Sequence, residues 1–203
     1  MHSLIKEIVA LDANEVNAEN ILSVLEKTNW EDFKIPALNI HAENDYCRIP
    51  LLHDFVSMYL MYWPGGAVSS IHEHKNFQGL IKILEGDLDE KEFNWNESEN
   101  KLELISEEMY RKGSILKEQN DAIHQVNNAF SSTPVISLHI YFPPTQSLYG
   151  SRLFDPERGR IATLSNKAQS FSWKQPQEAF ESIRHSNFGF SKTIDNSIPV
   201  MQS

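Results

Sequence analysis

Cysteine and long apolar runs are both scarce in this chain of 203 residues. Cys47 is its one cysteine, which excludes a disulfide bond within the chain and is typical of proteins in a reducing compartment. A lone cysteine is more often a small packed hydrophobe than a nucleophile, so we interpret Cys47 as a packing residue. No apolar run approaches the roughly 20 residues of a membrane-spanning helix, so we expect no membrane partner.

Positive charge is also in short supply. The chain has 18 Lys and Arg against 28 Asp and Glu, which gives a formal net charge of -10. Nucleic-acid binding depends on clustered basic residues that neutralise phosphates, so this balance argues against nucleic acid as a partner. The first residues, 1–7, lack the basic region and the apolar stretch of a signal peptide. We therefore expect a cytoplasmic protein.

Apolar and turn-forming residues predict a helical start followed by short strands. Residues 1–30 carry apolar side chains at helical spacing, with Asn14 or Asn17 as a candidate N-cap. From about residue 46, runs of β-branched and aromatic residues end at glycine or proline, as strands do. The clearest of these runs are 55–63, 80–84, 88–95, 102–105 and 135–142.

Such short strands at hairpin spacing favour a mainly β fold, an antiparallel barrel or jelly roll, because this closure leaves few open edges. We predict a single domain over residues 1–203, with N-terminal helices in 1–30, a barrel in 46–165 and a C-terminal extension in 166–203. The strand signal weakens from Phe171 onward. Aromatic residues there are expected to pack onto the barrel, and residues 193–203 to form a loosely held tail.

His72 and His74 form the most informative motif. They stand two residues apart in a segment with strand character, and side chains at i and i+2 of a strand project from the same face. The intervening Glu73 points the other way. Two imidazoles on one face can bind one transition-metal ion, such as Fe, Zn, Cu or Ni.

A second motif supplies a third histidine, His124. Its spacing from Gly113 and to Asn128 fits the second motif of the cupin superfamily, and the segment around His72 and His74 fits the first. One such motif alone is weak evidence, whereas two in the right order within an all-β pattern predict a cupin barrel.

Two departures from the cupin motifs bear on the chemistry. Gly79 stands at the acidic position of the first motif, and Gln119 and Asp121 replace the usual proline and glycine of the second. Three neutral histidines without a carboxylate leave a divalent metal open coordination positions. A structural zinc site would more often be closed by four ligands.

Ser137, His139 and Tyr141 alternate with apolar residues, so all three lie on one face of a strand. If that face is the barrel interior, they form a hydrogen-bonded line that enters the metal cavity. A polar strand face whose hydrogen bonds are merely satisfied is the competing interpretation.

Together these motifs resemble cysteine dioxygenase type I and its thiol dioxygenase relatives over about residues 28–165. Further matching segments are Tyr46–Arg48, Ser69–His72, Leu80–Gly86, Pro143–Pro144 and Phe154–Asp155. The resemblance implies an Fe(II) centre held by His72, His74 and His124. It also implies a small thiol and O2 as reactants, in a monomer or small homo-oligomer.

The resemblance carries further roles onto single residues. Tyr141, with His139 and Ser137 behind it, would hydrogen-bond to bound substrate or oxygen. Arg48, with Tyr46 beside it, would hold the substrate carboxylate, for which a guanidinium fork is well shaped. Mammalian members cross-link a cysteine to the tyrosine. That position is Gly79 here, so we expect no cross-link, as in the bacterial-type members.

The expected reaction is the oxidation of L-cysteine by O2 to cysteine sulfinic acid. Relatives that act on 3-mercaptopropionate typically carry glutamine where Arg48 stands and an arginine after the tyrosine strand. Arg152 stands near that second position, so 3-mercaptopropionate, or another small thiol, is an alternative substrate. The sequence also leaves open a cupin that binds a metal or ligand without catalysis, and a zinc or manganese cupin isomerase.

Overall fold

The computed structural model describes residues 2–30, 46–128, 132–145 and 147–192. Its N-terminal part is helical, with α1 (His2–Val9), a 3-10 turn at Ala13–Glu15 and α2 (Ala18–Lys27). Of the two candidate caps, Asn17 caps α2, because its side chain accepts a hydrogen bond of 2.9 Å from the backbone N–H of Asn20. In the described residues, no helix has both the length and the hydropathy needed to cross a bilayer.

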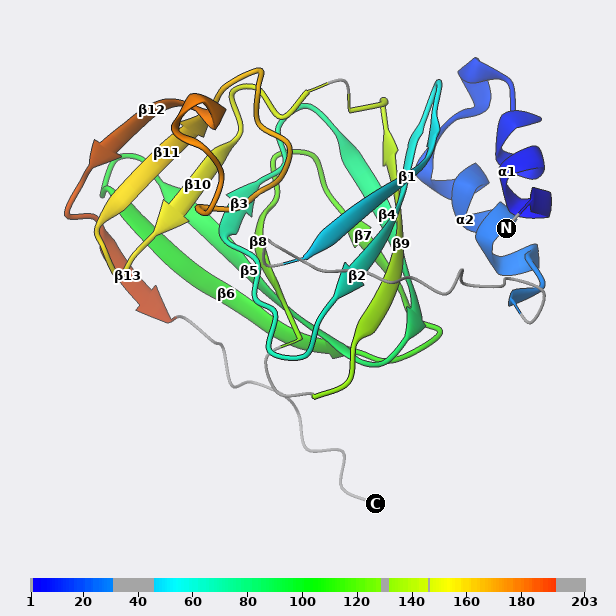
Figure 1. The fold of residues 1–203 in the computed structure, drawn as a ribbon, viewed down its shortest axis with the longest axis horizontal. Coiled ribbons are helices and arrows are strands. Elements are labelled where there is room, and N and C mark those ends of the chain that lie inside the picture. The colour runs from blue at the N-terminus through cyan, green and yellow to red at the C-terminus, as the bar shows by residue number, and fades with distance from the viewer. Residues whose placement is uncertain (1, 31–45, 129–131, 146, 193–203) are drawn as a thin grey trace.

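Two curved sheets follow and face each other (Figure 1). The five-stranded sheet has the order β1 (Cys47–His53), β2 (Ser57–Trp63), β9 (Val135–Phe142), β4 (Gln78–Glu85) and β7 (Ile115–Glu118). The eight-stranded sheet has the order β12 (Phe180–His185), β11 (Arg160–Leu164), β10 (Arg152–Asp155), β3 (Ile71–Glu73), β8 (Ile123–Asn127), β5 (Leu88–Asn96), β6 (Lys101–Tyr110) and β13 (Gly189–Lys192). The predicted mainly β, jelly-roll fold with N-terminal helices is confirmed.

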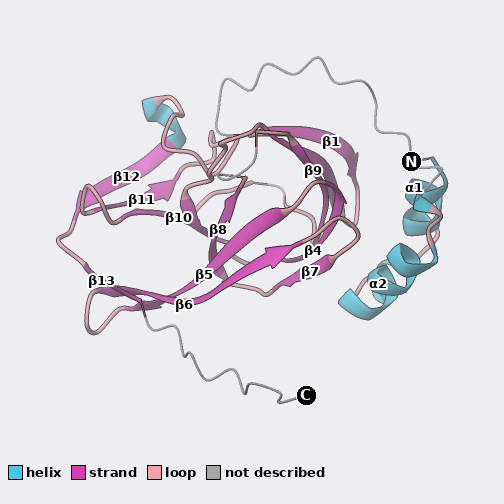
Figure 2. Cartoon of the chain, turned by 90° about the horizontal axis from the view of Figure 1, so that it is seen from below, coloured by secondary structure: helices cyan, strands magenta, loops and turns pink. Residues whose placement is uncertain are grey.

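Strand β9 shows how the sequence separates the layers. Leu138, Ile140 and Phe142 belong to the apolar cluster that α1 and α2 form with the outer face of the five-stranded sheet. This cluster also includes Leu4, Ile8, Ile21 and Leu25 of the helices, all fully buried. Figure 2 shows the helices on that outer side. Because side chains alternate along a strand, Ser137, His139 and Tyr141 of β9 point inward, between the sheets.

The C-terminal part contains structure that the sequence pattern did not predict. Strand β12 continues the eight-stranded sheet beside β11, and β13 pairs in parallel with β6. A further 3-10 turn spans Gln177–Ala179. Phe188 is buried as expected, and Phe171 is buried as well, but Phe190 is 46% exposed. Residues 193–203 lie outside the described part, so a single domain over 1–203 stays a prediction.

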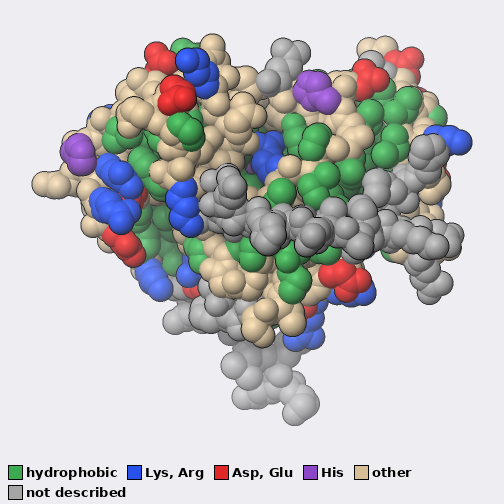
Figure 3. All heavy atoms as spheres, viewed as in Figure 1, with side chains coloured by type: hydrophobic (Ala, Val, Ile, Leu, Met, Phe, Trp, Pro, Cys, Tyr) green, Lys and Arg blue, Asp and Glu red, His purple; other side chains and the backbone are tan. Residues whose placement is uncertain are grey.

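Charged side chains of both signs are interspersed among hydrophobic and polar ones on the face shown in Figure 3.

Candidate metal centre

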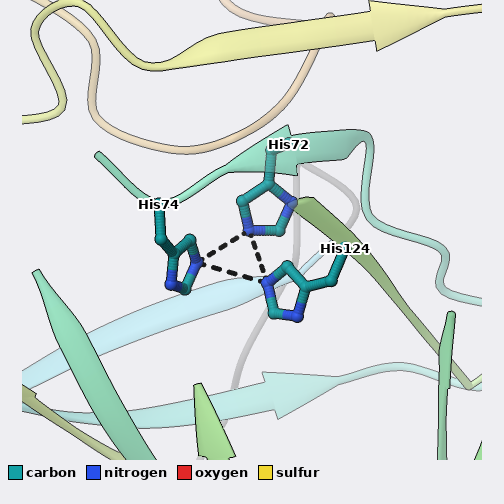
Figure 4. A group of neighbouring side chains, drawn as sticks. All are labelled: His72, His74 and His124. Carbon is teal, nitrogen blue, oxygen red and sulfur yellow. Dashed lines mark hydrogen bonds between the residues drawn. The ribbon is translucent and has the colours of Figure 1, made fainter. Parts of the chain in front are cut away.

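The pairing of β3 with β8 brings the three histidines together. His72 lies directly opposite His124 in this antiparallel pair, and His74 follows β3 on the same face as His72. Their Nε2 atoms converge, at 3.1 Å between His72 and His74, 3.0 Å between His72 and His124, and 3.2 Å between His74 and His124 (Figure 4). All three side chains are buried. They form one of two groups among the described residues that could hold a metal ion, and the other consists of Glu90, Glu118 and His124.

Hydrogen bonds at the far side of two rings assign their tautomers. The Nδ1 of His72 lies 2.9 Å from the carbonyl oxygen of Ser70, and the Nδ1 of His124 lies 2.6 Å from Oε1 of Glu90. A carbonyl or a carboxylate oxygen accepts, so each Nδ1 carries the proton and each Nε2 presents a lone pair. Two lone pairs 3.0 Å apart repel each other unless a cation lies between them. The donor set therefore fits a divalent transition metal.

Electrostatics keep two of these histidines in the neutral, ligating form. Burial and the neighbouring His124 lower the pKa of both His72 and His74 well below the usual value. Burial also lowers the pKa of His124, but the carboxylates of Glu118 and Glu90 more than offset it, so the net direction is upward.

Two buried glutamates at the centre were missed by the sequence analysis. Glu90 of β5 accepts a hydrogen bond from the Nδ1 of His124. Histidines that bind a metal commonly donate such a hydrogen bond to a carboxylate. Glu118 of β7 places Oε2 3.1 Å from the Nδ1 of His74 and Oε1 3.5 Å from the Nε2 of His124. Neither oxygen of Glu118 has a hydrogen-bond partner within the described residues. Burial raises the pKa of Glu118. The expectation of a centre without a carboxylate nearby was therefore incomplete.

Ser137, His139 and Tyr141 form a hydrogen-bonded line beside the histidines. The indole N–H of Trp63 donates to the Oγ of Ser137 over 3.0 Å, Ser137 lies 2.9 Å from the Nε2 of His139, and the Nδ1 of His139 lies 2.8 Å from the hydroxyl of Tyr141. Burial lowers the pKa of His139 to about 3, so the ring is neutral and has one donor and one acceptor nitrogen. Burial also raises the pKa of Tyr141 well above its usual value, which keeps the phenol protonated.

Burial determines which group donates and which accepts in each hydrogen bond of this line. Ser137 is fully buried, and its hydroxyl contacts only Trp63 and His139 among the described residues. If His139 donated to Ser137, the serine proton would have no acceptor, at a cost of about 1–3 kcal/mol. Ser137 therefore donates to His139, and His139 donates to Tyr141. The O–H of Tyr141 is then free to point into the cavity.

A small cavity adjoins the histidines and is lined by Tyr46, Arg48, Glu118 and Tyr141, among others. Its volume is about 20 Å³, which is room for roughly one water molecule. Phe171 occupies one side, because its ring stacks on His72 with 4.1 Å between ring centroids.

The two residues expected to bind substrate lie at this cavity. Tyr46 is buried, and its hydroxyl accepts a hydrogen bond of 3.0 Å from the backbone N–H of Phe171. Arg48 is half-buried on β1, where its guanidinium lies over the Tyr59 ring and donates to the carbonyl of Gln169 over 3.1 Å. Their roles towards a substrate stay predictions.

Arg152 is engaged elsewhere. Its guanidinium makes two hydrogen bonds to Glu73, of 2.9 and 2.7 Å. Because Glu73 points away from its two neighbouring histidines, this ion pair lies outside the metal cavity, which does not include Arg152 in its lining.

Comparison with known proteins gives this site a context. The model of the family "Cysteine dioxygenase type I" matches residues 1–152. The chain is 33% identical to cysteine dioxygenase type 1 of Bos taurus over 155 residues, which cover 71% of this chain and 73% of the relative. It is 35% identical to the Danio rerio protein of the same name over 115 residues, which span 53% of this chain and 54% of that protein.

Among solved structures, the chain is similar to a sugar phosphate isomerase from a cupin superfamily, from Silicibacter pomeroyi. The identity is 13% and the TM-score 0.45, over 71% of this chain and 79% of that chain.

The fold and the converging imidazoles define a metal-binding cupin. The family match over residues 1–152 goes one step further: the chain belongs to the cysteine dioxygenase type I family, a family of non-haem iron thiol dioxygenases. The predicted resemblance is confirmed.

Proposed function

We propose that this chain oxidises L-cysteine with O2 to cysteine sulfinic acid at an Fe(II) ion held by His72, His74 and His124. The observation that carries the proposal is the convergence of three Nε2 atoms within 3.2 Å, beside the hydrogen-bonded line that ends at Tyr141. Family membership supplies the reaction class. Fe(II), when bound there, supplies the redox chemistry with O2 and favours the thiolate form of the substrate. Both oxygen atoms end on sulfur, so no external reductant is needed.

Tyr141 acts in this proposal as a fixed hydrogen-bond donor. The line from Trp63 through Ser137 and His139 orients its O–H into the cavity before substrate arrives, so no reorganisation is needed during the reaction. Its raised pKa means that it holds its proton rather than giving it away.

In this proposal Arg48 binds the carboxylate that cysteine and 3-mercaptopropionate share, and the preference for cysteine follows from the resemblance, in which cysteine dioxygenases carry arginine at this position. Its guanidinium lies at the cavity and can bind a carboxylate with two parallel hydrogen bonds. Arg152 is held by Glu73, which weakens the case for 3-mercaptopropionate as the substrate. Because the cavity holds about one water molecule, lining side chains must move before a thiol enters, and Phe171, which stacks on His72, is one of those lining side chains.

The test is oxygen uptake by the iron-loaded protein with cysteine and, separately, with 3-mercaptopropionate, with sulfinate identified by mass spectrometry. Cysteine should give the higher kcat/KM, and Arg48→Gln should remove that preference. Sulfinate formed from 3-mercaptopropionate alone would establish that thiol as the substrate. If iron is bound and neither thiol yields sulfinate, the proposal is wrong, and a dioxygenase of another small thiol or a non-catalytic cupin is left.

The turnover and the iron content of Tyr141→Phe are a second, independent test of the proposal. The proposal expects a large loss of turnover with iron content unchanged, since the phenol donates to reactants and does not hold the metal. A binding module has no turnover to lose.

A further inference from the structure

Glu118 is a buried carboxylate without a partner of its own. It is 5% exposed, and neither oxygen has a hydrogen-bond partner within the described residues. In the same part of the chain, the ion pairs of Glu118 involve only histidines, His74 and His124, and no lysine or arginine. An isolated buried carboxylate is costly unless it is protonated or lies close to a cation, and a metal ion held by the neighbouring histidines would be such a cation.

The sheet register explains how the carboxylate reaches the centre. Gly79 of β4 is paired with Tyr141 on one side and with Glu118 on the other. A Cβ atom at Gly79 would lie 2.7 Å from Cδ1 of Tyr141 and 3.1 Å from Oε2 of Glu118. The two side chains therefore lean into the space that a side chain at residue 79 would fill. Gly79 is the acidic position of the first cupin motif, and here a carboxylate occupies that space from the neighbouring strand.

The distances place this carboxylate at the edge of a coordination shell. Donors about 2.1 Å from a metal and at right angles lie about 3.0 Å apart. The three histidine Nε2 atoms, at 3.0 to 3.2 Å, match that spacing. The Oε1 of Glu118 lies 3.5 Å from the Nε2 of His124, so a shift of about half an ångström would bring it to the same spacing.

We propose that Glu118 is a fourth protein ligand, which makes this a centre of three histidines and one carboxylate. The proposal deepens the proposed function because it concerns the same metal, but it does not depend on which thiol is oxidised. A carboxylate ligand neutralises one charge of the ion and takes one position beside the histidine face. The substrate would then be held by its sulfur at the metal and by Arg48 at its carboxylate.

Zinc binding by the metal-free protein tests the proposal without any substrate. Zn²⁺ affinity is measured by competition with a chromogenic chelator for the wild type, Glu118→Gln and Glu73→Gln. Glu73 is the matched control: it is another buried glutamate, between two histidine ligands in sequence, but its carboxylate binds Arg152. Glu118→Gln should lower the Zn²⁺ affinity more than 100-fold, because a loss of 10–100-fold is typical of a group that only hydrogen-bonds to a metal ligand. Glu73→Gln should change the Zn²⁺ affinity little. A loss of 100-fold or less for Glu118→Gln would be the effect of a group that only contacts the ligands, and would overturn the proposal.

A crystal structure of the zinc-loaded wild type is a second test, and it does not depend on whether a variant folds. That structure should show an oxygen of Glu118 about 2.0–2.2 Å from the ion. A carboxylate more than 3 Å from a zinc ion held by the three histidines would overturn the proposal. Since neither measurement uses a thiol or O2, failure here leaves the dioxygenase proposal standing, and the reverse also holds.

Discussion

Replacement of Glu90 by glutamine should weaken metal binding through His124. The Oε1 of Glu90 lies 2.6 Å from the Nδ1 of His124, and both side chains are buried, so the charge on Glu90 makes the imidazole a better donor. Glutamine keeps the size and one acceptor oxygen but removes that charge. We expect a loss at the lower end of the 10–100-fold range for such partners, about tenfold, or about 1.4 kcal/mol. Glu90→Leu also removes the acceptor and should approach 100-fold.

Two assays measure this effect. Chelator competition gives the Zn²⁺ dissociation constant directly. Thermal unfolding at a free metal concentration of about 100 Kd adds roughly 2.7 kcal/mol to the wild type, which raises Tm by about 5–11 °C in a chain of this size. Glu90→Gln should lose about half of that shift under the same conditions. Glu107→Gln is the control, since it removes a carboxylate from an exposed ion pair with Lys91 on the neighbouring strand.

A role for Glu90 in metal binding is refuted if Glu90→Gln binds zinc within twofold of the wild type while the metal-free proteins unfold alike. The Glu90–His124 hydrogen bond would then serve the fold and not the metal.

Three other changes test the rest of the site. Ser137→Ala should lower Tm, because it leaves the indole of Trp63 and the Nε2 of His139 without a hydrogen-bond partner. It should also lower turnover, because His139 can then change tautomer. Calorimetry measures the first effect and oxygen uptake the second. Phe171→Ala should speed the removal of bound metal by a chelator, because its ring covers His72, and an unchanged rate would show that metal leaves by another path. Gly79→Ala should reduce turnover, because a Cβ 2.7 Å from Tyr141 displaces the phenol, and wild-type kcat would contradict the tight contact.

Local alternation made much of the fold and of the site predictable from sequence. In β9, apolar side chains that face the helices alternate with Ser137, His139 and Tyr141, so strand, layer and polar line could all be inferred from one segment. The same rule placed His72 and His74 on one face. These features depend on neighbours two residues apart, and such neighbours are visible in the sequence.

Features that depend on strand register could not be predicted in this way. Glu90 and Glu118 are ordinary glutamates in strands with several charges, and nothing local marks them as inward-facing. Their position follows from pairings such as β5 with β8 and β4 with β7, which join distant segments. Strands β12 and β13 were missed for a related reason: most of their side chains are exposed, so no apolar alternation marks them.

Gly79 shows why a ligand missing from a motif is not necessarily missing from the site. A motif is written along one segment, whereas a metal's ligands are neighbours in space and can come from any strand in register. The glycine removes one side chain from β4, and this removal makes room for two others, from β9 and β7. Because Tyr141 and Glu118 both use that room, a side chain at residue 79 would force at least one of them away from the metal. The glycine is therefore required by the side chains of Tyr141 and Glu118. Its presence in place of the acidic cupin residue indicates a rearranged ligand set, in which the carboxylate comes from another strand.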